Sequence, residues 1–270
     1  MKKNNIFKAI PLRAWCLILV LAALNSLGLI LLWRGSGPRG FFSRQAVWTY
    51  IGAMAFIAAI ALGWKRILQA APWVAVGWLG LGLVAKSINS DLCFRLGPLV
   101  IDTALWSPLS IGLFFAWLTQ KLRRCVVGVA IIVTAVLSLS ISWACQMLRI
   151  ESPDELMLQE WTSAPDQAAI VFGNWYNIVC LSLFGTLFLL LVRFCHQARN
   201  TPKRVFCVVV GVLLFTVVFC GYAPYYGIVS PSSHNFVPFL SYGGTPLLIA
   251  WIAMGILVTS TIDEESRGEG

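Results

Sequence analysis

The chain has 270 residues, of which 59% are hydrophobic and only 11% are charged, and its formal net charge is +9. A soluble domain covers its surface with about 25% charged residues, so this composition excludes a soluble globular protein and indicates that the solvent is lipid. The basic residues are spread between apolar runs instead of forming one patch, so the positive charge does not indicate nucleic-acid binding.

Long apolar runs recur along the whole chain, each close to the roughly 20 residues that a helix needs to span a bilayer. Unpaired backbone groups are costly in lipid, so these runs are expected to be helices and not strands. We predict an all-α bundle of about eight transmembrane helices, forming a single integral membrane domain over residues 1–270. The predicted spans are 14–33, 46–63, 73–89, 99–118, 125–146, 169–192, 205–222 and 239–260.

The basic residues predict the topology. With the N-terminus placed inside, most of them fall in cytoplasmic segments, which is the positive-inside pattern. Both termini are then cytoplasmic, and the first span is expected to be an anchor and not a cleaved signal, because its apolar stretch is long and no Ala-x-Ala site follows. The basic residues that fall outside are Arg34, Arg39, Arg44, Lys86, Arg95 and Arg149.

The predicted outside loops carry most of the polar density beside the membrane. The longest, from about 149 to 167, holds five of the eleven acids, and the last, 221–237, is rich in Pro, Tyr, Ser and Asn. A site for a lipid head group would have to be built there, although most of these acids are expected only to keep the loop solvated. The eight cysteines form no C-x-x-C pair, so neither a metal cluster nor a disulfide framework is predicted. The loop acids are Glu151, Asp154, Glu155, Glu160 and Asp166.

The segment Pro231-Ser-Ser-His-Asn-Phe-Val-Pro-Phe-Leu-Ser-Tyr-Gly-Gly-Thr-Pro-Leu-Leu248 precedes the last span. Its prolines fix φ and remove donors, and its glycine pair allows close backbone approach, so a non-helical shape is expected. The segment resembles the C-terminal signature of the FtsW/RodA/SpoVE family of shape, elongation, division and sporulation proteins. His234 and Thr245-Pro246 depart from that signature. The positions in register are Pro231, Pro238, Phe239, Ser241, Tyr242, Gly243 and Gly244.

Weaker matches extend this resemblance. Residues 42–52 are similar to the start of the family's second helix, and Gly97-Pro98-Leu99 is similar to the segment before its fourth. The family's Gln-Pro-Ser-Glu segment is replaced by Asp102-Thr-Ala-Leu105 and Pro108, and its central Gln-Pro-Asp-Leu-Gly-Thr segment has no counterpart here. The resemblance therefore implies a shortened and divergent member that lacks a hairpin of the usual ten helices.

The family implies an activity: polymerisation of lipid II into peptidoglycan strands by a membrane glycosyltransferase that uses an extracytoplasmic aspartate. Asp166 matches that aspartate, Gly173 a glycine seven residues later, and Asn174-Trp175 replaces a pair of glutamates. A second register, based on Gln167, leaves no catalytic aspartate. Cations or a divalent metal would stabilise the leaving pyrophosphate. The candidate substrate-binding residues are Arg149, Arg95, His234, Ser241, Tyr242, Gly243 and Gly244, with Lys86 a further candidate cation.

Three functions remain open from the sequence. The first is this glycosyltransferase, acting in division or elongation at the outer face of a bacterial cytoplasmic membrane beside a single-pass class B penicillin-binding transpeptidase, as the resemblance implies. The second is an inactive scaffold or regulatory subunit, which the missing segments favour. The third is a transporter of lipid-linked precursors, which would predict charged residues inside several spans and paired halves.

Overall fold

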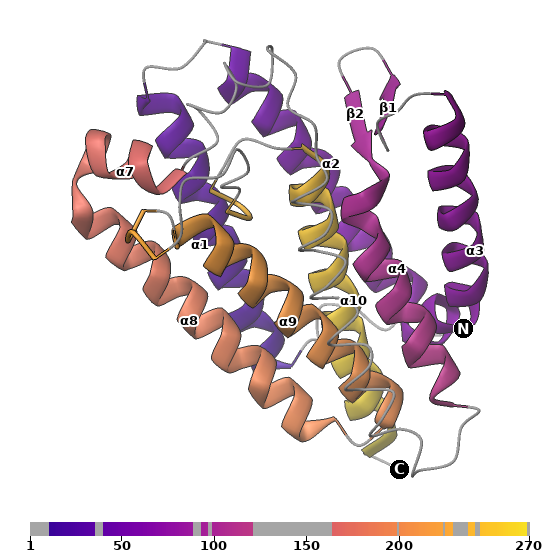
Figure 1. Cartoon of the computed structure of the whole chain (residues 1–270). Helices are drawn as coiled ribbons and strands as arrows, with labels where there is room; N and C mark the ends of the chain where they lie inside the picture. Colours follow the sequence, from indigo (N-terminus) through magenta and orange to yellow (C-terminus); the bar gives the residue numbers. More distant parts are fainter. Residues whose placement is uncertain are drawn as a thin grey trace.

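The computed structural model describes residues 11–35, 40–88, 93–96, 99–120, 164–198, 200–223, 225–228, 237–240 and 244–268. The predicted span 125–146 lies outside the described residues. Over the described part of the chain the fold is a bundle of eight helices, as the hydropathy predicts (Figure 1). The helices are α1 (Leu12–Arg34), α2 (Gly40–Leu62), α3 (Trp64–Ile88), α4 (Thr103–Leu118), α7 (Ala164–Phe172), α8 (Asn174–Gln197), α9 (Thr201–Tyr222) and α10 (Gly244–Gly268).

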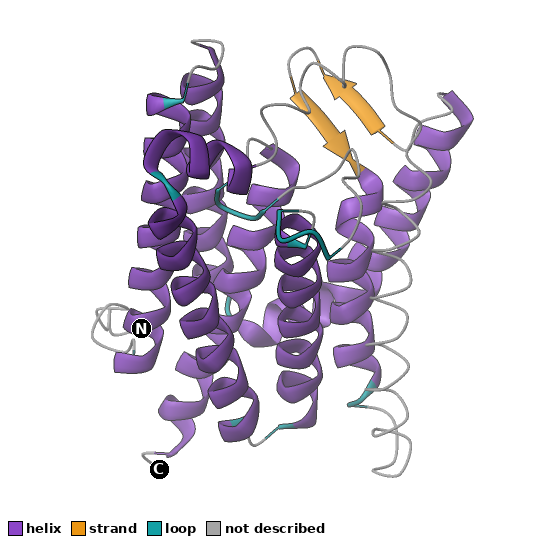
Figure 2. Cartoon of the chain, turned by 60° about the vertical axis from the view of Figure 1, so that its left-hand side comes forward, coloured by secondary structure: helices purple, strands orange, loops and turns teal. Residues whose placement is uncertain are grey.

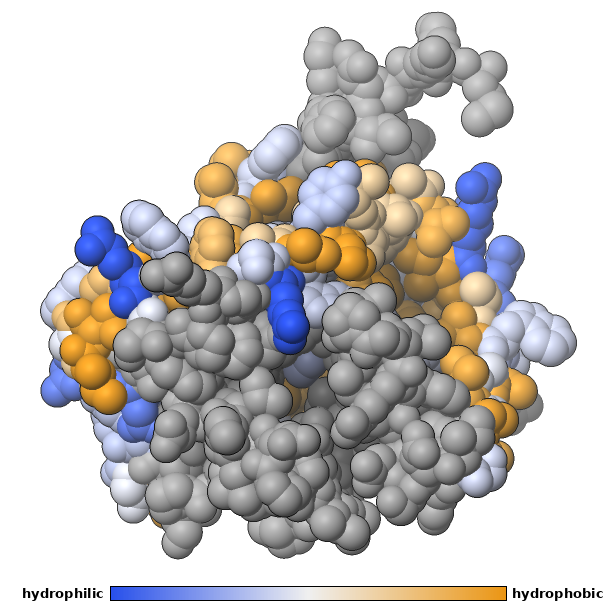
Figure 3. All heavy atoms as spheres, turned by 90° about the horizontal axis from the view of Figure 1, so that it is seen from above, coloured by the Kyte–Doolittle hydropathy of each residue, from blue (hydrophilic) through white to orange (hydrophobic). Residues whose placement is uncertain are grey.

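The chain is a multi-pass membrane protein. Among the described residues, four helices are long and apolar enough to cross a bilayer, at Leu12–Arg34, Phe42–Leu62, Asn174–Gln197 and Thr201–Tyr222, and shorter apolar helices lie at Leu109–Leu118 and Pro246–Ile262. Large apolar side chains such as Trp73, Leu83 and Leu189 are strongly exposed, which suits helices that face lipid. Seen from the end that carries α7, hydrophobic residues reach the periphery between hydrophilic ones (Figure 3).

Two of the predicted spans are corrected by the structure. The span 99–118 begins as a strand, because β2 (Leu99–Asp102) pairs antiparallel with β1 (Cys93–Leu96) and the helix starts only at Thr103. The two residues between the strands are Gly97 and Pro98, which favour a turn, and Val100 and Ile101 favour a strand. The span 169–192 is broken at Gly173, whose φ of 80° ends α7 and begins α8.

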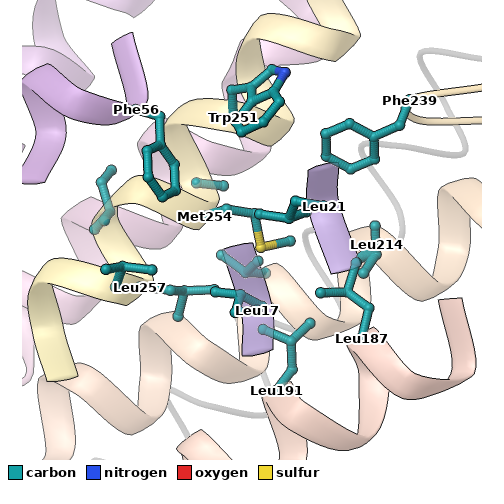
Figure 4. Close-up of a cluster of buried hydrophobic side chains, with 14 of the residues drawn as sticks. Leu17, Leu21, Phe56, Leu187, Leu191, Leu214, Phe239, Trp251, Met254 and Leu257 are labelled. Atoms are coloured by element: carbon teal, nitrogen blue, oxygen red, sulfur yellow. The ribbon is translucent and has the colours of Figure 1, made fainter. Parts of the chain in front are cut away.

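The helices pack around an apolar core between α1, α8, α9 and α10. Helix α10 lies along α2, and α3 lies along α4 (Figure 1). Helix α9 packs against both α4 and α8, while α1 contacts α8 and α2. Figure 2 shows the bundle turned by 60°. Core side chains from several helices point toward one another (Figure 4). Those labelled there are Leu17, Leu21, Phe56, Leu187, Leu191, Leu214, Phe239, Trp251, Met254 and Leu257.

Hydrogen bonds define one end of the bundle. The Arg13 guanidinium, at the start of α1, donates to the side chain of Gln197 at the end of α8. The buried Lys203, at the start of α9, donates to the carbonyl of Ser260 near the end of α10. The first helix therefore begins at the end where the last one finishes, as an even number of spans requires. We call the opposite end, which carries the end of α1, the helix α7 and residues 237–240, the α7 end (Figures 1 and 2). That the α7 end faces outward stays a prediction.

Glycines allow α2 and α10 to approach closely. A Cβ added at Gly255 would lie 2.9 Å from the Phe56 carbonyl oxygen and 3.0 Å from the Ala59 Cβ, and one added at Gly52 would lie 2.3 Å from the Trp251 ring. Helices in lipid associate through small residues at such contacts. Burying an apolar side chain against another helix gains little, because lipid is equally apolar. The close approach of α2 and α10 therefore depends on the absence of a side chain at these two glycines.

We predict that Gly255→Ala destabilises the protein although alanine is the better helix former. The added methyl meets backbone that cannot move away cheaply, and overpacking costs about 1–3 kcal/mol. The matched control is Gly185→Ala in α8, where nothing lies within 4 Å of the new Cβ. We expect the Tm in detergent to fall by about 3–6 °C for Gly255→Ala and not to fall for Gly185→Ala. Equal Tm values for the two variants would contradict the packing.

Candidate functional site

The described part of the C-terminal signature that precedes α10, residues 237–240, forms a buried turn. The amide of Leu240 donates to the carbonyl of Val237 over 3.2 Å, and Val237, Phe239 and Leu240 are at most 2% exposed. Pro238 occupies the second position of the turn and Phe239, with a φ of 68°, the third. Proline followed by a positive φ is the pattern of a type II turn, in which glycine usually takes the third position. We call residues 237–240 the buried turn.

Phe239 tolerates this backbone conformation because its ring is fully packed. The ring lies edge-on to Trp251 with centroids 5.9 Å apart, and Trp251 in turn lies edge-on to Phe56 (Figure 4). A left-handed conformation costs a side-chain-bearing residue about 1–2 kcal/mol. Burying a phenylalanine side chain returns about 1.5–3 kcal/mol, so packing offsets the backbone cost. The ring acts as an anchor that holds the turn inside the bundle.

Helix α1 fits against the backbone of the buried turn. A Cβ at Gly28 would lie within 3.0 Å of the Phe239 carbonyl and of the Leu240 Cα. One turn earlier, the Asn25 side chain accepts a hydrogen bond of 3.3 Å from the Thr49 hydroxyl of α2. Asn25 is 7% exposed. The family-like segment at residues 42–52 contributes the buried Gln45, which is 1% exposed, and the close contact at Gly52.

The second feature of the α7 end is the bend between α7 and α8. Gly173 adopts the positive φ that turns the chain, and the rings of Phe172 and Tyr176 stack across the bend with centroids 4.9 Å apart. The Tyr176 hydroxyl, on a side chain 2% exposed, donates to the carbonyl of Leu27 in α1. The bend is thereby tied to α1.

Two more hydrogen bonds hold the elements around this bend. The Asn177 side-chain amide donates to the carbonyl of Pro165 over 2.8 Å, which binds the first turn of α7 to the first turn of α8. The Tyr225 hydroxyl donates to the Asn174 side chain over 2.6 Å, which binds the segment after α9 to the start of α8. The first turn of α7 is thus held by α8, and the start of α8 is held by the segment after α9.

The bend and the buried turn share one support. Leu27 and Gly28 are consecutive in α1: the carbonyl of the first accepts the bond from Tyr176, and the second contacts the buried turn. Asp166 lies in the first turn of α7 with an exposed side chain, directly after the Pro165 that Asn177 holds. The α7 end therefore presents an exposed carboxylate on a short helix and a buried non-helical turn, both of them supported by α1.

The structure describes only part of the predicted site. Asp166 is described, Gly244 is the first residue of α10, and Arg95 lies in β1. Whether Asp166 is catalytic stays a prediction, and no three His, Cys, Asp or Glu side chains gather as metal ligands within the described ranges. The predicted site residues that lie outside the described residues are Arg149, His234, Ser241, Tyr242 and Gly243.

Sequence reasoning misses the side chains that fix this geometry. In the sequence, Tyr176 and Asn177 are only part of one apolar span, and Gly28 is only one residue of another. A signal for Asn177 is present, because a polar residue inside a transmembrane helix is expensive and usually faces a partner within the protein. The sequence alone does not show that its partner is the carbonyl of a residue that precedes it by three turns of helix and a bend.

Comparison with known proteins agrees with this architecture. Residues 172–267 match the model of the FtsW/RodA/SpoVE family, described as cell cycle protein. Two curated proteins from Helicobacter pylori, each named probable peptidoglycan glycosyltransferase FtsW, are 36% identical over 81 residues and 34% identical over 82 residues. These matches cover 30% of this chain and 20% and 21% of the relatives, so they span about a fifth of the relatives' length.

Solved structures share the fold over most of the chain. The rod shape determining protein RodA of Thermus thermophilus has a TM-score of 0.70 at 16% identity, covering 91% of this chain and 95% of that one. A chain from a peptidoglycan synthase complex that coordinates polymerisation and crosslinking has a TM-score of 0.69 at 18% identity, covering 94% and 98%. The resemblance found in the sequence is therefore confirmed over residues 172–267, which match the family model, and the fold over most of the chain is the one seen in RodA.

We predict that Phe239→Gly is less destabilising than Phe239→Ala. Both variants lose the buried ring, at a cost of about 3–5 kcal/mol, but only glycine also relieves the positive φ. Thermal unfolding in detergent should therefore give Tm values in the order wild type, Phe239→Gly, Phe239→Ala. Leu189→Ala, which removes a side chain 69% exposed on α8, serves as the control and should stay near wild type. An alanine variant as stable as the glycine variant would contradict the turn geometry.

Proposed function

We propose that the chain is a peptidoglycan glycosyltransferase that polymerises lipid II during cell division or elongation. In this proposal the α7 end lies at the outer face of the bacterial cytoplasmic membrane, as the distribution of basic residues predicts. The single observation that carries the proposal is the exposed Asp166 on helix α7, at the same end of the bundle as the buried turn at residues 237–240. The names of the Helicobacter pylori relatives support the same reaction.

The proposed reaction needs a base and a cationic group that stabilises the negative charge of the leaving pyrophosphate. The Asp166 carboxylate takes the proton of an acceptor sugar hydroxyl while that oxygen bonds to the anomeric carbon of the donor sugar. The bond from this carbon to the pyrophosphate oxygen breaks, and undecaprenyl pyrophosphate leaves with the bonding electrons. A base on a fixed helix suits this step, because correct placement of reacting groups supplies much of the rate.

Cations at the α7 end are proposed to bind the pyrophosphate. The predicted candidates are Arg95, Arg149 and, when protonated, His234. The structure adds two described arginines: Arg34 ends α1 with its guanidinium over the ring of Trp33, and Arg44 is exposed in the first turns of α2. Fixed cations stabilise developing negative charge more than mobile ones do. A divalent cation remains an alternative to them.

A single-pass class B penicillin-binding transpeptidase is the proposed partner. This follows from the family resemblance and is supported by the solved complex, whose description joins polymerisation with crosslinking. A scaffold or regulatory subunit without activity is the second candidate function. The specific observation in its favour concerns Asn174, which stands where the family has an acid. Its side-chain oxygen accepts a hydrogen bond from the Tyr225 hydroxyl.

We predict that Asp166→Ala and the isosteric Asp166→Asn both abolish lipid II polymerisation. Removing a general base typically costs about 10²–10⁴-fold in rate, and the amide keeps the shape but cannot accept the proton. The assay follows glycan-strand length after lipid II is added to the purified protein with its co-purifying partner. The matched control is Ile170→Ala, on the same helix with a side chain 79% exposed, which should polymerise at the wild-type rate.

Two outcomes separate the candidates. Strand formation by the wild type that is lost in both Asp166 variants, at unchanged yield of folded protein, supports the enzyme. Failure of the folded wild type to polymerise in the presence of its partner overturns the enzyme and favours the scaffold. Full activity of Asp166→Asn would leave the enzyme standing and remove Asp166 as its base.

A further inference from the structure

Asn177 is a buried polar residue that the proposed reaction does not use. It lies in the first turn of α8, inside a helix apolar enough to span a bilayer, and its side chain is 1% exposed. Its amide nitrogen donates to the Pro165 carbonyl, while its Oδ1 is buried without a hydrogen-bond partner among the described residues. A buried polar atom left unpaired costs stability, so apolar packing alone does not explain an asparagine here.

The orientation of the Asn177 amide follows from chemistry. Proline has no N–H, so the backbone at Pro165 offers only an acceptor to a neighbouring side chain. The nitrogen of the Asn177 amide must therefore face Pro165, and the oxygen must face away. This removes the usual ambiguity between the two ends of an asparagine amide.

We propose that Asn177 is the positioning residue for Asp166, an inference that rests on the proposed function. The Pro165 carbonyl and the Asp166 amide belong to one planar peptide unit, so a bond that fixes the carbonyl fixes the plane from which Asp166 continues. The proline ring fixes φ on the other side of the same residue. Asn177 thus sets the direction in which the Asp166 side chain leaves helix α7.

The burial of Asn177 separates this role from substrate binding. A side chain 1% exposed, beneath a carbonyl that it already binds, does not reach a lipid-linked sugar at the surface. Its effect on the reaction must pass through the placement of Asp166. Loss of the hydrogen bond should therefore lower the rate at which bound lipid II reacts and leave its binding affinity unchanged. A displacement of about 1 Å at a reacting group can cost about 100-fold in rate.

The experiment compares Asn177→Leu with wild type in the polymerisation assay, using purified lipid II over a range of concentrations and the protein with its co-purifying partner. Leucine keeps the shape, loses the donor and removes the unpaired oxygen. We expect the rate at saturating lipid II to fall about 10–100-fold and the half-saturating concentration to stay within about 2-fold. The control is Ser182→Ala, an exposed residue of α8 whose hydroxyl bonds to its own helix at Ile178, and it should match wild type.

Thermal unfolding of the same samples distinguishes positioning from support of the fold. We expect the Tm of Asn177→Leu to stay within about 3 °C of wild type, because the lost bond and the removed unpaired oxygen offset each other. If the leucine variant does not yield folded protein, Asn177→Ala is measured in its place. A variant that loses rate, raises the half-saturating concentration and lowers the Tm together would overturn the positioning role.

The remaining outcomes separate this inference from the proposed function. If Asp166→Ala is inactive while Asn177→Leu polymerises at the wild-type rate, the positioning role is wrong and the glycosyltransferase stands. If the folded wild type and every variant fail to polymerise, the proposed function fails and this inference falls with it. If Asn177→Leu lowers the polymerisation rate while the half-saturating concentration and the Tm stay unchanged, both the positioning role and the proposed function are supported.

Discussion

The structure depends on the rule that backbone polar groups must be satisfied within the protein where no water reaches them. Regular helices obey this rule by themselves, and each departure from a helix needs a specific solution. At the bend between α7 and α8, the amide of Gly173 donates to the carbonyl of Ala169 over 3.0 Å, and the amide of Tyr176 donates to the carbonyl of Gly173 over 3.2 Å. At residues 237–240 the turn closes its own bond from Leu240 to Val237. The non-helical backbone of the α7 end exists because these partners exist.

The same rule explains why glycines and aromatic rings gather at this end. A non-helical segment inside the bundle needs room, and Gly28 supplies it by letting α1 approach the Phe239 carbonyl. It also needs fixed walls, which the rings of Phe239, Trp251 and Phe56 provide. The two departures from helix meet on one turn of α1, at Leu27 and Gly28. The bend and the buried turn therefore rest on the same turn of one helix.

Much of the fold is predictable because hydropathy alone determines where a helix must cross lipid. The runs that form α1, α2 and α9 are recognisable in the sequence, and the turn before α10 is expected from its prolines and glycines. The hairpin is missed because Leu99-Val100-Ile101 is as apolar as a transmembrane helix. A short, uniformly apolar run does not show whether its side chains repeat with the period of a strand or of a helix. The bend is missed because one glycine in an apolar run is compatible with a continuous helix. The partners of Tyr176 and Asn177 are unpredictable because they are backbone carbonyls, which carry no sequence signal.

The buried, unpaired oxygen of Asn177 bears on the choice between enzyme and scaffold. A buried amide with one unpaired oxygen costs about 1–3 kcal/mol, and an apolar isostere at this place would avoid that cost. A scaffold needs α8 and its lipid-facing surface, but it gains nothing from fixing the direction of one exposed aspartate on a nine-residue helix. An enzyme gains from that direction directly, since its rate depends on where the carboxylate points. A local cost that apolar packing would avoid is expected more at functional sites than elsewhere. The held first turn of α7 therefore favours a chain that does chemistry at Asp166 over one that only assembles other proteins.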